Sequence, residues 1–338
     1  MDLSPTDILK SEIIGNISVD QQDAYTKKWE ESEENLGRDI FRDLFSHIRT
    51  IHKKTKPQDT LLKEFRSHVK ASENSVKFID DVLLPYTAAF DIIKQASYKS
   101  SQNAAQVNHP IAWLNQIDNF DWQPSAILYL AKNPQDTAKL TEFFTLLERF
   151  AAGMMISRAN VNYRLDRYAK ILTAIEANAN LSVPDSPLNL TTQERSEIVS
   201  KLDGDLYQQG KIRQYVLLRL DEALSALGVT HKYSKVTIEH VLPQNPLRNS
   251  QWVQNFSDAE REQSTHKLGN LVLLNGSKNS QAQNFDFDLK KRKYFMASGG
   301  ITTFALTSQV LNEIQWTPQV IARRQNDLLN KLKNVWQL

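Results

Sequence analysis

The stretch that decides the fold lies in the C-terminal third of the chain and consists of TIEHVLPQ at residues 237–244, HKLGNLVLL at 266–274 and KNSQAQNFDFDLK at 278–290. β-Branched and aliphatic runs in the first two segments predict two short strands, Val236–Ile238 and Leu268–Leu274. A long polar loop, with Trp252 and Phe256 as expected anchors, joins them. Loops of this length inside a compact domain are usually functional.

The polar residues of these segments have the chemistry of a phosphodiester-cleaving site. Asn270 follows His240 by 30 positions, and Asn279 follows Asn270 by 9. A histidine suits the activation of water near neutral pH, so His240 is the candidate base. A hard cation such as Mg²⁺ or Mn²⁺ prefers oxygen ligands, which Glu239 and Asn279 supply. We expect Asn270 to fix the geometry of the site.

Glu239 and His240 are neighbours in the first predicted strand. Adjacent side chains of an extended strand point to opposite faces, so the two share a site only if the strand bends or ends there. Pro243 follows shortly afterwards and supports such an ending.

Together the three segments resemble the HNH (ββα-metal) nuclease motif, in the form found at the C-terminus of GmrSD-type modification-dependent restriction enzymes and related SspE-type phage-defence proteins. The resemblance covers about a third of the chain. It implies His240 as general base, Glu239 and Asn279 on the metal side, and Asn270 as the middle Asn of the motif. Lys278, Lys290 and Lys291 are expected to contact DNA phosphates. His266 is expected either as a phosphate contact or as an anchor of the loop.

The sequence departs from many HNH domains at two points. The chain contains no Cys, so no structural zinc is expected and the domain must rest on packing. Glu239 stands where many HNH enzymes have Asp, which allows metal contact through a water molecule.

The remainder of the chain has the periodicity of successive helices. We expect a mainly α protein, with a multi-helix domain at 1–228 and a small α+β HNH domain at 229–338. The predicted helices of the first domain cover 21–52, 60–70, 75–96, 111–116, 124–132, 136–160, 162–179, 191–202 and 211–227. Further helices are predicted at 277–283, 287–297 and 318–336.

The segment Leu3–Lys10 resembles the sequence just after the N-terminal nucleotide-dependent module of the same proteins. That module's Asp-Gly-Gln-Gln-Arg signature and any phosphate-binding Gly-x-x-x-x-Gly-Lys loop are absent from the sequence. We therefore expect the chain to be a fragment or a truncated version without NTPase activity, whose partners include the missing nucleotide-dependent module or a partner protein.

Composition indicates an ordinary globular protein, with 41% hydrophobic residues, 24% charged residues and a net charge of +2. No apolar stretch approaches the length of a transmembrane helix, and no secretion signal is visible, so a cytoplasmic location is expected. Residues 229–338 hold 14 Lys and Arg against 8 Asp and Glu. This local basic excess favours a phosphate-rich partner.

Two functions from different classes remain open. The first is a metal-dependent endonuclease or nickase that acts on double-stranded DNA, modified or of phage origin, in antiphage restriction. The second is a non-catalytic DNA-binding or assembly module on an HNH scaffold. The sequence leaves open which modification is recognised, glucosylated cytosine and phosphorothioate both being family options, and whether one strand or two are cut.

Overall fold

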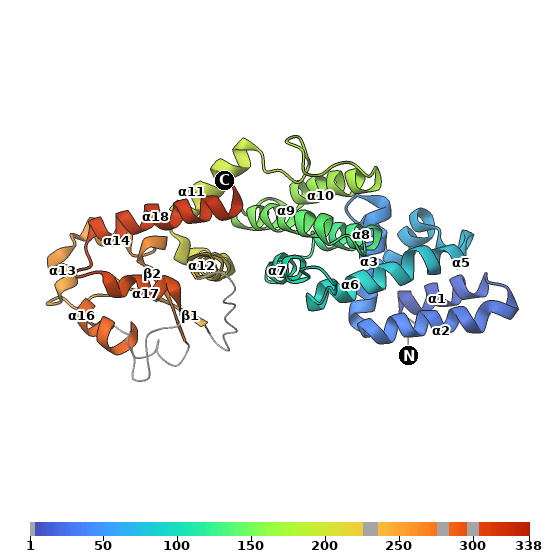
Figure 1. The fold of residues 1–338 in the computed structure, drawn as a ribbon, viewed down its shortest axis with the longest axis horizontal. Coiled ribbons are helices and arrows are strands. Elements are labelled where there is room, and N and C mark those ends of the chain that lie inside the picture. Colours follow the sequence, from blue (N-terminus) through green and yellow to red (C-terminus); the bar gives the residue numbers. More distant parts are fainter. Residues whose placement is uncertain (1–3, 226–235, 276–283, 296–303) are drawn as a thin grey trace. The chain divides into compact units, whose positions relative to one another are not determined.

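The computed structural model describes residues 4–225, 236–275, 284–295 and 304–338. The chain divides into two compact units, unit 1 at Met1–Leu190 and unit 2 at Thr191–Leu338. Most described residues are helical, and the strands among them form one two-stranded sheet (Figure 1). The predicted class, mainly α with a small α+β domain, is confirmed. None of the described helices is both long and apolar enough to cross a bilayer.

Unit 1 is built entirely of helices in its described part. In chain order they are α1 (Pro5–Gly15), α2 (Val19–Leu36), α3 (Arg38–Lys53), α4 (Leu61–Glu64), η1 (Phe65–Val69), η2 (Ala71–Glu73), α5 (Ser75–Phe78), η3 (Ile79–Leu83), α6 (Leu84–Gln95), α7 (Ala105–Leu114), α8 (Gln123–Lys132), α9 (Thr137–Ile156) and α10 (Val161–Glu176).

One predicted helix of unit 1 is two helices in the structure. The pattern at 21–52 predicts a single element, but Gly37 separates α2 from α3 with φ +76°, a conformation that side-chain-bearing residues rarely adopt. The break lets the two helices pack on one another. Trp29 of α2 contacts Phe41 and Phe45 of α3, with ring centroids 5.8 and 5.3 Å apart.

The units divide between Leu190 and Thr191, upstream of the boundary at residue 228 that the change in sequence pattern suggests. Helices α11 (Thr192–Asp203) and α12 (Lys211–Leu224) pack on elements of unit 2. Thr191 begins this unit as the N-cap of a capping box, in which its side chain accepts from Glu194 N and Glu194 Oε2 accepts from Thr191 N.

Unit 2 combines the sheet with short helices. After α11 and α12, with η4 (Leu206–Gln208) between them, its elements are β1 (Val236–His240), α13 (Gln251–Asn255), α14 (Asp258–Ser264), η5 (Leu268–Asn270), β2 (Leu271–Asn275), α16 (Phe287–Lys290), η6 (Lys291–Phe295), α17 (Ala305–Ser308), η7 (Gln309–Asn312) and α18 (Pro318–Trp336). The helix predicted at 277–283 lies outside the described residues.

The two strands pair antiparallel, with Ile238 opposite Leu273 and His240 opposite Leu271. The second strand starts later than predicted, because Leu268–Asn270 form a single 3₁₀ turn before it. Asn270 therefore lies at the entrance to the strand instead of inside it.

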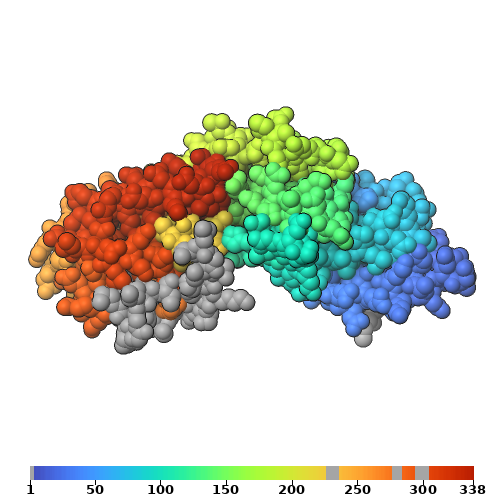
Figure 2. Space-filling view, viewed as in Figure 1, coloured from blue at the N-terminus to red at the C-terminus, as the bar shows by residue number. Residues whose placement is uncertain are grey.

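Helix α18 supports the sheet region of unit 2. It packs against the turn η5 and lies beside α12, as the red and yellow surfaces in Figure 2 show. The buried guanidinium of Arg324 donates to the carbonyls of Gly269, Leu271 and Leu306 at 3.1, 3.3 and 3.0 Å. One side chain thus joins α18 to the turn, to β2 and to α17.

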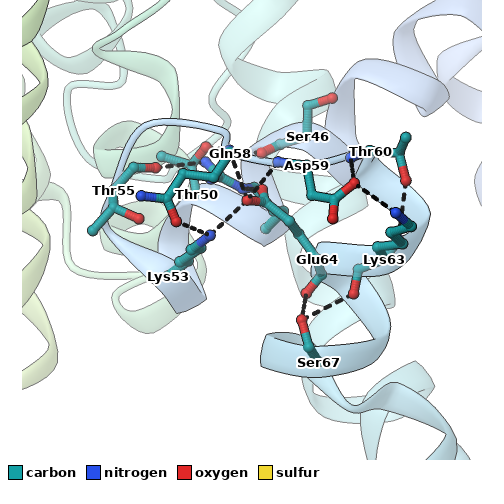
Figure 3. Close-up of polar contacts among 11 residues, drawn as sticks. Ser46, Thr50, Lys53, Thr55, Gln58, Asp59, Thr60, Lys63, Glu64 and Ser67 are labelled. Carbon is teal, nitrogen blue, oxygen red and sulfur yellow. Dashed lines mark hydrogen bonds and ion pairs between the residues drawn. The ribbon is translucent and has the colours of Figure 1, made fainter.

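Unit 1 contains a buried carboxylate cluster centred on Glu64 (Figure 3). Arg49 and Lys53 form ion pairs with Glu64, and the backbone N–H groups of Gln58 and Asp59 donate to its Oε1 at 2.8 and 3.2 Å. Burial alone would raise the pKa of Glu64, but these hydrogen bonds, led by that of Arg49, outweigh burial and lower the pKa from 4.5 to about 2. The cluster ties the loop before α4 to the end of α3.

We predict that protonation of Glu64 destabilises unit 1. Because its folded-state pKa is depressed, the carboxylate contributes its full stability above pH 4.5 and loses it as the pH falls toward about 2. Glu64→Gln should lower the free energy of unfolding at neutral pH by about 3–5 kcal/mol, since Arg49 then stays buried without a counter-charge. Thermal unfolding followed by circular dichroism across this pH range measures both effects.

Glu73→Gln is the matched control, because the Lys70–Glu73 pair has side-chain exposures of 54% and 69%. Exposed pairs of this kind contribute little. Equal losses of stability in the two variants would contradict the role given to Glu64.

Candidate active site

The side chain of Asn270 organises the site from inside unit 2. It is fully buried, and its Oδ1 accepts from Leu242 N at 2.8 Å and from Trp316 Nε1 at 3.1 Å. Its Nδ2 donates to the carbonyls of Leu242 and Thr265, both at 2.9 Å. The expected geometric role agrees with these contacts, and the contacts are to the segment after β1 rather than to the His240 ring.

Gly269 lies where the backbone of the turn meets α18. A Cβ at this position would lie 2.5 Å from the carbonyl oxygen of Ile321 and 2.9 Å from the backbone nitrogen of Gln325. Gly269 N donates to Gln325 Oε1 at 2.7 Å in the same contact. Because Gly269 has no side chain, the turn can approach the backbone of α18 closely, and this approach positions Asn270.

Glu239 and His240 lie at the end of β1, as the sequence analysis requires for a shared site. Lys290 of α16 bridges them, because its Nζ lies 2.8 Å from Glu239 Oε1 and donates to the His240 carbonyl at 2.7 Å. The Glu239 side chain is only 12% exposed. Burial raises the pKa of Glu239, while the ammonium of Lys290 opposes that change.

His240 is enclosed, with 5% of its surface exposed. Its Nδ1 lies 3.2 Å from Gln244 Nε2, whereas its Nε2 has no hydrogen-bond partner in the structure as described. Burial, followed by electrostatic repulsion from His266, Lys290 and Arg213, lowers the pKa of His240 to about 3. The imidazole is therefore neutral at physiological pH, which is the form that accepts a proton.

Two further aromatic rings enclose His240. The ring of Tyr207, in η4, lies 4.1 Å from that of His240, and the ring of His266 lies 5.5 Å from it. No sequence signal indicated Tyr207, which stands in a polar segment distant along the chain. His266, for which a phosphate contact and a loop anchor were both open, meets Tyr207 and His240 through its ring, and its Nδ1 is enclosed without a partner among the described residues.

A comparison with protein families matches part of the chain. Residues 192–331 match the family model for the C-terminal domain of GmrSD restriction endonucleases. This part of the chain is therefore similar to a GmrSD C-terminal domain. The match begins within α11, so it agrees with the start of unit 2 and includes Tyr207 as well as the sheet. No curated protein matches the chain.

The structure corrects one expected DNA contact of unit 2. Lys290 has 0% exposure, and both of its contacts are internal, so it cannot lie on a DNA-binding surface in this conformation. Lys291 donates to the Glu313 carbonyl at 2.6 Å and is partly exposed, so its DNA contact stays a prediction. Lys278 and Asn279 lie outside the described residues.

The described part of unit 2 fits a divalent cation only in part. Glu239 offers a carboxylate at the end of β1, and the unpartnered Nε2 of His240 shows a buried polar atom in need of a partner. Lys290 already occupies Glu239 Oε1. Where side chains are described, no group of three His, Asp or Glu residues is placed to hold a metal. The described residues thus offer Glu239 and His240, and Asn279 remains a proposed ligand.

We predict that Gly269→Ala destabilises unit 2, because the new methyl group would meet the backbone of α18 and not a flexible side chain. Overpacking of this kind costs about 1–3 kcal/mol. Chemical denaturation of the full chain measures the loss. Gly15→Ala is the control, since a Cβ there meets no atom within 4 Å. A Gly269→Ala protein as stable as the Gly15→Ala protein would contradict the close approach to α18.

Proposed function

We propose that this protein is a metal-dependent DNA endonuclease or nickase of an antiphage restriction system. The observation that carries the proposal is the neutral His240 imidazole at the end of β1, whose Nε2 has no partner among the described residues and which lies beside the buried carboxylate of Glu239. The match to a restriction-endonuclease domain supports DNA as the substrate.

In the proposed reaction His240 Nε2 takes a proton from the attacking water, and the water oxygen attacks the phosphorus of a DNA phosphodiester. The bond from phosphorus to the leaving 3′ oxygen breaks, and that oxygen departs with the electron pair and takes up a proton from solvent. Glu239 and Asn279 are the residues proposed to hold Mg²⁺ or Mn²⁺, which when bound neutralises charge on the phosphate and the leaving oxygen. Lys290 keeps the Glu239 carboxylate in place. Asn270 holds the segment after β1, and so limits movement of His240.

A non-catalytic role as a DNA-binding or assembly module is the competing function. The observation in its favour is the ion pair between Lys290 and Glu239, which places an ammonium on one oxygen of the proposed metal ligand. The two functions differ in whether purified protein breaks phosphodiester bonds.

We predict that the protein converts supercoiled plasmid to open-circular or linear DNA with Mg²⁺ or Mn²⁺, and not with EDTA. His240→Ala should lower the rate by about 10²- to 10⁴-fold, since it removes the general base. Its DNA affinity, measured by fluorescence anisotropy, should stay at the native level because the fold is retained. Gel analysis of the plasmid over time measures the rates.

His68→Ala is the matched control, because His68 is exposed in unit 1 and outside the site. It should cut plasmid at the native rate. Native protein that binds DNA but leaves the plasmid supercoiled under every metal condition would support the non-catalytic module instead.

A further inference from the structure

Tyr207 is held in place by the backbone and by a cation. Its N–H donates to the His266 carbonyl at 3.1 Å, and its own carbonyl accepts from Arg213 Nη1 at 2.6 Å. The Arg213 guanidinium also lies 4.2 Å from the centroid of the Tyr207 ring. Such a cation–π contact adds to the restraint on the ring.

The ring of Tyr207 contacts both histidines of the site. Its centroid lies 4.1 Å from that of His240 with the planes tilted by 59°, and 5.6 Å from that of His266 with the planes nearly parallel, at 14°. The two imidazoles lie 5.5 Å apart and nearly perpendicular, at 73°. The three rings therefore contact one another in one cluster.

Hydrogen bonds do little to orient the His240 ring. Its described ring contact is the 3.2 Å approach of Gln244 to Nδ1, which is at the long end of such bonds. Nε2 of His240 and Nδ1 of His266 are both enclosed without a partner among the described residues. Among the described residues, packing against Tyr207 and His266 adds to the contacts that fix the plane of the His240 ring.

We propose that Tyr207 is a positioning residue for His240. Its ring, braced by Arg213 and stacked with His266, fixes the imidazole plane so that Nε2 faces the attacking water. The proposal rests on the proposed nuclease function and extends the site beyond the ββα segment to η4. A misdirected base lowers the rate of the chemical step without weakening DNA binding, because orientation contributes to the barrier alone.

The test compares Tyr207→Phe, which keeps the ring, with Tyr207→Leu, which keeps apolar bulk without a ring. Tyr163→Ala, which removes an exposed aromatic residue from unit 1, is the control. Steady-state nicking gives kcat and KM for plasmid. Heteronuclear NMR of ¹⁵N-histidine-labelled protein, without metal or DNA, reports the imidazole of His240, identified by its loss in His240→Gln. Thermal unfolding reports the fold.

Tyr207→Leu should lower kcat by about 10- to 100-fold with KM unchanged, the range expected for a displaced catalytic group. Its His240 imidazole signals should broaden as the ring samples more than one orientation. Tyr207→Phe and Tyr163→Ala should match the native protein in rate and spectrum. A Leu variant with sharp His240 signals or native kcat would overturn the proposal, as would an equal loss of kcat in the Phe variant.

The two proposals fail in different ways. If the native protein cuts no plasmid, the proposed nuclease function is wrong. The His240 imidazole signals of the native and Tyr207→Leu proteins then show by themselves whether Tyr207 orients the ring. If His240→Ala loses kcat while folded Tyr207→Leu keeps the native rate, the proposed nuclease function stands and the positioning role of Tyr207 is overturned. If the Leu variant unfolds, Tyr207→Met, which also lacks a ring, supplies the same comparison.

Discussion

The arrangement of unit 2 depends on one buried amide. Asn270 can make four hydrogen bonds through its side chain, two as acceptor and two as donor, and it makes all four with Leu242, Thr265 and Trp316. These partners come from three separated segments of the sequence. A buried polar group that loses a hydrogen-bond partner still carries the free-energy cost of its desolvation. Displacement of any one of the three segments would therefore destabilise the contacts that Asn270 makes with the others.

Helix α18 supports the sheet region of unit 2. In a chain without Cys, Arg324 links the turn, β2 and α17 through carbonyl acceptors, although burial lowers its pKa to about 10. Around this contact lies an apolar core that includes Trp252 and Trp316. Packing against a long terminal helix thus fixes the sheet to which the site residues belong.

The sequence predicted the elements whose signals are local. Helical periodicity located most helices of unit 1, and the burial of Trp252 and the strand end at Glu239 and His240 follow from short patterns. The boundary after Leu190 was also marked, by prolines and by the Thr191 capping box, but the change of pattern near residue 228 was the more conspicuous signal.

Contacts between distant segments were the ones that the sequence did not predict. Lys290 begins a run of four basic residues, and nothing in that run distinguishes the buried member from its exposed neighbours. Lys290 can be buried because its ammonium donates to the carboxylate of Glu239, which lies 51 positions earlier in the sequence. The place of Tyr207 in the site likewise depends on the rings of His240 and His266, which lie near it only in the folded chain. Long-range pairing of this kind has no periodicity that a single sequence would reveal.

The central claim is that Glu239 and Asn279 hold a metal while His240 acts as a base beside it. Mn²⁺ binding, followed by isothermal titration and electron paramagnetic resonance on the native protein and three alanine variants, separates these roles most directly. The account predicts one Mn²⁺ per chain, lost in Glu239→Ala and Asn279→Ala and retained in His240→Ala. Absence of Mn²⁺ binding in the native protein, or binding that is unaffected by Glu239→Ala, would contradict it.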